Sequence, residues 1–108
     1  MGRMPESESV RFARAQDGHV SVSAPRDLQP IEDFLESDIG DNVPELQLVI
    51  EHARNPGPAP WGFGGDSCHV SIGPDDVRVE NDFTGEYVTL PRLDFLHILA
   101  EYAGAIRP

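Results

Sequence analysis

The stretch from Asn55 to Gly65, NPGPAPWGFGG, holds three prolines and four glycines. Proline removes a backbone hydrogen-bond donor and fixes φ, and glycine adds conformational freedom, so this stretch is incompatible with a regular helix or a central strand. It therefore divides the chain into two halves joined by a connector, and we expect Trp61 and Phe63 to pin that connector to the core. A chain of 108 residues corresponds to a single domain.

Short alternating runs on both sides of this connector predict β-strands. Asp17-Gly18 suits the positive φ angles of a tight hairpin turn, and Gly73-Pro74 begins a second turn. We expect two hairpins and one additional strand, formed by residues 10–13 and 19–22, 68–72 and 77–80, and 87–90.

Apolar residues at helical spacing predict three helices. The first covers 31–39 and stops at Gly40, and the second follows the capping residue Asn42 and ends at Arg54. The third begins near Pro91, with an apolar face made of Leu93, Leu96, Leu99, Tyr102, Ala103 and Ile106.

The predicted fold class is α+β, an antiparallel sheet of about five strands with three helices in the order ββαα, connector, βββα. Residues 1–8 are polar, so we expect a disordered N-terminal segment followed by one domain at 9–108.

The charge is strongly negative, because 19 Asp and Glu residues face 8 basic residues and the formal net charge is −11. Such a chain repels nucleic-acid phosphates and anionic lipids and favours encounters with basic proteins. No apolar run approaches the 18 or so residues that span a bilayer. The N-terminus lacks a secretory apolar stretch, and the lone Cys68 suits a reducing compartment, so we expect a cytoplasmic protein.

Nothing in the sequence indicates an enzyme, a metal site or a cofactor. Cys68 and His69 are adjacent on a predicted strand, so they point to opposite faces and cannot form a catalytic dyad. The histidines at 19, 52, 69 and 97 lack metal-site spacing, and the glycines at 62–65 lack the lysine of a phosphate-binding loop. A catalytic pair among the carboxylates stays open.

The acidic residues form two groups. The first runs from Glu32 to Glu45 without a basic residue, and the second surrounds the strand turns and includes Glu86. One interpretation is a solvated face that maintains solubility, and the other is a surface that meets a basic partner. On the second interpretation the partner-binding residues are Glu32, Asp33, Glu36, Asp38, Asp41, Asp75, Asp76, Glu80 and Asp82.

Residues 60–106 combine a tryptophan, a glycine-containing bend, two alternating strands and a short segment leading into a helix that carries Phe95 and Leu96. This pattern resembles the immunity proteins of bacterial contact-dependent growth-inhibition (CDI) systems, and is similar to the YacL-like family. The resemblance implies a cytoplasmic protein that binds a cognate toxin domain, often a nuclease, and blocks it. The alternative is a small regulatory or housekeeping adaptor. We expect a monomer or a homodimer joined through the sheet edge.

Overall fold

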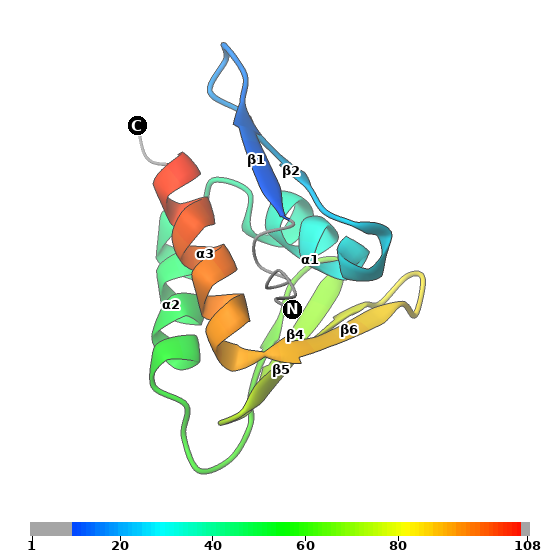
Figure 1. Ribbon diagram of the computed structural model, residues 1–108, viewed down its shortest axis with the longest axis vertical. Helices are drawn as coiled ribbons and strands as arrows, with labels where there is room; N and C mark the ends of the chain where they lie inside the picture. The colour runs from blue at the N-terminus through cyan, green and yellow to red at the C-terminus, as the bar shows by residue number, and fades with distance from the viewer. Residues whose placement is uncertain (1–9, 107–108) are drawn as a thin grey trace, which may run out of the picture.

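The computed structural model describes residues 10–106, so the predicted disordered segment 1–8 lies outside the described residues. Three α-helices and six strands follow one another along this part of the chain (Figure 1). In order they are β1 (Arg11–Arg14), β2 (Val20–Ser23), the 3-10 turn η2 (Arg26–Leu28), α1 (Gln29–Asp33), the π-helix η3 (Phe34–Ile39), α2 (Val43–Arg54), β3 (Trp61–Gly64), β4 (Cys68–Ile72), β5 (Asp76–Asn81), β6 (Tyr87–Pro91) and α3 (Arg92–Ile106).

The α+β class is confirmed, but the single sheet of about five strands is wrong. Within residues 10–106, β1 and β2 form a two-stranded antiparallel sheet, and the second sheet has the order β3-β4-β5-β6. The additional strand, β3, comes from the predicted connector, where Trp61 and Phe63 turn inward and Gly62 and Gly64 outward. Glycines at the outer positions hide the alternation, because in the sequence they indicate a loop and not a strand. The strand lies at one edge of the four-stranded sheet.

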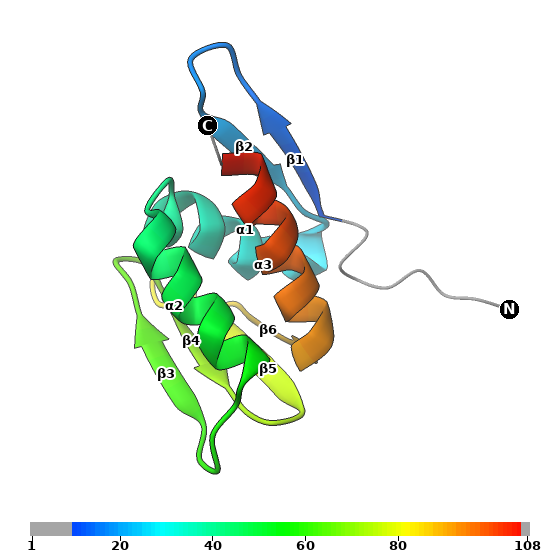
Figure 2. The ribbon, with the colours of Figure 1, turned by 90° about the vertical axis from the view of Figure 1, so that its left-hand side faces the viewer.

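The helices cover one face of the four-stranded sheet (Figure 2). Alternate residues of β4 and β5 are buried beneath them, and the intervening side chains, such as His69 and Arg78, are exposed on the opposite face. Helices α2 and α3 run side by side, and the β1–β2 hairpin packs against the C-terminal part of α3, where the rings of Phe12 and Tyr102 lie 5.6 Å apart. No helix among the described residues is long and apolar enough to cross a membrane.

The core is centred on Phe34, whose ring contacts Phe63 at 5.9 Å and Phe95 at 6.5 Å between centroids. The buried stripe of α3 consists of Phe95, Ile98, Leu99 and Tyr102. Leu93 was expected on this stripe but is 66% exposed. It precedes Phe95 by two residues, and residues two apart do not share a helix face.

The first predicted helix is real, but it begins at Gln29 and changes from α to π geometry at Phe34. It stops at Gly40, which has a φ of 56° and donates its N–H to the Leu35 carbonyl. The Tyr102 hydroxyl from α3 lies 2.6 Å from the Gly40 oxygen and 3.1 Å from the Leu35 oxygen. The Tyr102 hydroxyl therefore lies within hydrogen-bond distance of two carbonyls at the end of this helix, and one of them, that of Leu35, also accepts the Gly40 N–H.

Asp38, near the end of η3, joins the first half of the chain to the second. Its carboxylate accepts hydrogen bonds from the Ser67 N–H at 2.9 Å, the Ser67 hydroxyl at 2.8 Å and the Cys68 N–H at 2.8 Å. The approach is so close that a Cβ on Gly65 would lie 2.5 Å from the Asp38 Cγ. Glycine at 65 is thus required by the packing of this carboxylate.

We expect Gly65→Ala to lower the free energy of unfolding by about 1–3 kcal/mol, because the added methyl displaces a carboxylate held by three hydrogen bonds. Gly64→Ala is the matched control, since a Cβ there meets nothing within 4 Å. The control should stay within about 1 kcal/mol of the parent. Urea denaturation measures both, and equal effects would contradict the assigned contact.

Candidate functional site

The first acidic group is largely engaged inside the molecule. Glu32 accepts hydrogen bonds from the Ala24 N–H and the Gln29 amide, and Asp33 accepts one from the Asn81 amide at 2.9 Å. Asp38 holds the β3–β4 turn as described above. The carboxylates of these three half-buried residues are committed to the fold. Their neighbours Glu36 and Asp41 face a surface pocket instead.

The second acidic group is divided between the two ends of β5. Asp75 and Asp76 lie at the β4–β5 turn, where Arg92 donates its backbone N–H to the Asp75 carbonyl. Glu80 and Asp82 lie at the opposite end. A six-residue strand separates the two pairs by about 17 Å at the usual rise of about 3.3 Å per residue. The nine predicted residues therefore do not form one continuous surface.

The turn between β5 and β6, residues 81–86, presents an exposed aromatic side chain. Phe83 is 80% exposed, and the carboxylates of Asp82 and Glu86 flank it in sequence. We call residues 81–86 the Phe83 turn. Sequence reasoning assigned Phe83 no role, although an apolar side chain within a polar turn was the available signal.

The backbone of the Phe83 turn is held firmly. The side-chain oxygen of Asn81 accepts the N–H groups of Phe83 at 2.8 Å and Thr84 at 3.1 Å, and the Gly85 N–H donates to the Asn81 carbonyl. Asn81 is only 8% exposed, and its amide is fixed in turn by Asp33. A buried hydrogen-bonded pair thus positions an exposed aromatic residue.

The open face of the sheet brings together His69, Glu80 and Asp82. The His69 Nδ1 lies 2.6 Å from an Asp82 oxygen and its Nε2 lies 3.8 Å from a Glu80 oxygen, while Arg78 donates to the same Glu80 oxygen at 3.0 Å. The three residues offer ligand atoms within 4.8 Å of one another. An imidazole and two carboxylates could hold a divalent cation, with the guanidinium competing for one of them. His69 and Glu80 are partners across β4 and β5, and their spacing along the chain does not predict that they meet.

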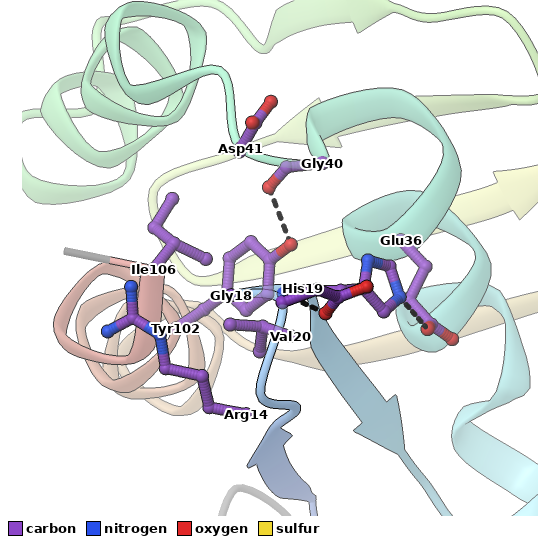
Figure 3. Close-up of a pocket in the computed structure, with 10 residues that line it drawn as sticks. Arg14, Gly18, His19, Val20, Glu36, Gly40, Asp41, Tyr102 and Ile106 are labelled. Atoms are coloured by element: carbon purple, nitrogen blue, oxygen red, sulfur yellow. Dashed lines mark hydrogen bonds and ion pairs between the residues drawn. The ribbon is translucent and has the colours of Figure 1, made fainter. Parts of the chain in front are cut away.

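A pocket of about 540 Å³ lies between the β1–β2 hairpin, the end of η3 and the last turns of α3 (Figure 3). We call it the hairpin pocket. Its charged residues come from separate segments of the chain, and the ring of Tyr102 forms part of its wall. The lining consists of Arg14, Asp17, Gly18, His19, Val20, Glu36, Gly40, Asp41, Tyr102 and Ile106.

Acidic residues from separate segments line the hairpin pocket. Burial, with added repulsion from Glu36 and Asp41, raises the pKa of Tyr102 to about 12. Both carboxylates therefore act on the same hydroxyl, although they lie on different segments. The phenol stays protonated at neutral pH and keeps its hydrogen bond to the Gly40 carbonyl (Figure 3).

Trp61 and Cys68 both serve the core. Trp61 is half-buried against the core and stacks on His52 of α2, with ring centroids 3.9 Å apart, as expected of a residue that pins this segment to the core. Cys68 is fully buried, and burial together with the nearby carboxylate of Asp38 raises its pKa to about 12. A thiol with so high a pKa is not a nucleophile at neutral pH.

Comparisons with models of known protein families, with curated proteins and with solved structures found no match to this chain. The resemblance to CDI immunity proteins therefore rests on the pattern of residues 60–106 alone.

We expect the Cys68 thiol to be unreactive towards dithiodipyridine in the native protein at about pH 8 and to react promptly once guanidinium chloride unfolds the chain. Because the pKa of Cys68 is higher in the folded than in the unfolded protein, its protonated thiol contributes to the free energy of unfolding below about pH 9. This contribution is lost as pH rises towards about 12. Thiol titration with and without denaturant measures this difference in the reactivity of Cys68. Rapid labelling of the native protein would contradict the prediction.

Proposed function

We propose that this protein binds and neutralises a basic protein partner, and that the Phe83 turn is the centre of the contact. The observation that carries the proposal is an aromatic side chain held 80% exposed on a rigid turn between two carboxylates. Large aromatic anchors surrounded by polar residues contribute most of the binding energy in many protein interfaces. Because the turn is already ordered, little conformational entropy is lost on binding.

The charge of the protein supports a basic partner. A net charge of −11 accelerates encounters with a positive surface. Asp82 and Glu86 belong to the Phe83 turn and Glu80 directly precedes it, although Glu80 and Asp82 also pair with Arg78 and His69. The partner surface that fits is an apolar depression with Arg or Lys residues at its rim.

The resemblance to immunity proteins gives this partner a class. We propose a cognate bacterial toxin domain, with a nuclease favoured because its own surface must attract phosphate. In this role the protein acts in the cytoplasm, makes no direct contact with nucleic acid and needs no catalytic group or cofactor.

The proposed role predicts that the gene directly upstream encodes the toxin, and we expect Phe83→Ala to weaken binding to that toxin domain by about 30-fold or more, as truncation of an interface anchor does. Calorimetry with the two purified proteins measures the loss. Affinity for the parent protein should also fall as salt is raised, because the rim contacts are ionic.

Leu93→Ala is the matched control. Leu93 is also a largely exposed apolar residue, at 66%, and it lies at the opposite end of the sheet from the Phe83 turn. It should leave the affinity unchanged. Equal affinities for the Phe83 and Leu93 variants would refute the proposed contact, and failure of the upstream domain to bind the parent protein would refute the immunity role.

A homodimeric adaptor is the second candidate, and the edge strand β3 favours it. This strand pairs with β4 on one side only, and its outward residues Gly62 and Gly64 leave the backbone accessible. If two copies join at this edge, sedimentation velocity will show a dimer that Gly64→Lys dissociates, because an edge lysine opposes strand pairing. A monomer at every concentration would exclude this candidate.

A further inference from the structure

The hairpin pocket combines charge with an apolar surface. Carboxylates reach it from three segments: Asp17 from the hairpin loop, Glu36 from η3 and Asp41 from the residues after that helix. Val20 and Ile106 line the pocket beside the ring of Tyr102 (Figure 3). A volume of about 540 Å³ is within the range of about 300–1,000 Å³ that is usual for small-molecule sites.

The three carboxylates differ in how they are engaged. Asp17 accepts the backbone N–H of His19 at 3.0 Å, and Glu36 lies 4.0 Å from the His19 ring. Asp41 forms no hydrogen bond or ion pair with any other residue described by the structure. Among the described lining residues these three acids stand against one guanidinium, that of Arg14. Within this part of the chain the acidic side chains therefore outnumber the guanidinium, and at least one carboxylate keeps its full capacity to accept hydrogen bonds.

We infer that the hairpin pocket binds a guanidinium or alkylammonium group carried on a short apolar stem. The carboxylates supply charge-assisted acceptors for the cation, and the apolar residues cover the methylene groups behind it. A neutral or anionic ligand of the same shape offers the carboxylates no charged donor, so it should bind more weakly than the cation.

Two sources carry this chemistry, an arginine or lysine side chain of a protein and a free cation such as agmatine. The protein source rests on the proposed function, because it places a basic residue of the toxin domain in the hairpin pocket. The free-cation source is independent of that function. The chemical feature common to both is the cationic head on an apolar stem, which small probes reproduce.

The experiment is an amide chemical-shift titration of the whole protein with N-acetyl-arginine amide, using N-acetyl-citrulline amide as a probe of nearly the same shape without charge. Saturable shifts at Gly18, Gly40 and Ile106 are expected with the arginine compound only, with a dissociation constant on the order of 1 mM. The inference is overturned if no saturable shift appears, or if citrulline binds equally well.

Substitutions around the hairpin pocket should change the affinity in opposite directions. Asp41→Asn removes a charge but keeps the shape, so it should weaken binding about fivefold. Arg14→Gln removes the resident cation and should strengthen binding by a similar factor. Asp75→Asn, at the far turn between β4 and β5, is the control and should have no effect. If Asp41→Asn and Asp75→Asn behave alike, the site is wrong.

N-acetyl-agmatine distinguishes the two sources, because it carries the same single charge as N-acetyl-arginine amide but no carboxamide. Tighter binding of N-acetyl-agmatine than of N-acetyl-arginine amide indicates a free cation, and the reverse order indicates a side chain within a peptide. Phe83→Ala should leave both probes unaffected, because Phe83 is not part of the pocket lining. Loss of probe binding in that variant would overturn the assignment to the hairpin pocket. The two proposals therefore fail separately, one in calorimetry with the toxin domain and the other in the titration.

Discussion

The carboxylate of Asp38 is the interaction on which the arrangement of the two halves depends. It reaches from the end of a π-helix across 29 and 30 residues of sequence to the N–H groups of Ser67 and Cys68. A charged acceptor bonded to two backbone donors and a hydroxyl is stronger than an ordinary neutral pair. Together with the Asp33–Asn81 bond, it fixes the first helical segment to two turns at one end of the four-stranded sheet. Some of the acidic residues of this protein therefore stabilise the fold and do not serve as surface charge alone.

Local periodicity was enough to place both predicted hairpins and all three helices, because their buried and exposed positions alternate at the spacing of each element. It failed at β3, where glycine occupies the outer positions and removes the polar half of the signal. The change to π geometry at Phe34 was also hidden, and so was the contact of its last turn with Tyr102 from a distant helix. The separation of the β1–β2 hairpin into its own sheet is likewise a tertiary outcome.

For the candidate sites, the sequence supplied residue types but not their grouping. It identified the acids correctly as abundant, yet it could not tell that Asp33 and Asp38 face inward while Asp41 faces a pocket. The sequence offered one signal for Phe83, an apolar side chain within a polar turn, but only the fold shows that this side chain is 80% exposed. The acids left at the surface lie mainly beside the Phe83 turn, around the hairpin pocket and at the β4–β5 turn. The net charge alone does not show this uneven distribution.

The anchoring of the Phe83 turn separates the residues that shape it from those that it displays. Asn81 and Asp33 determine the backbone path, whereas the side chains of Asp82 and Phe83 extend from that path and are exposed. Replacing the displayed side chains leaves the supporting bonds in place. Under the proposed function, the exposed side chains of this turn can be exchanged, and its specificity altered, while the bonds that hold its backbone are kept.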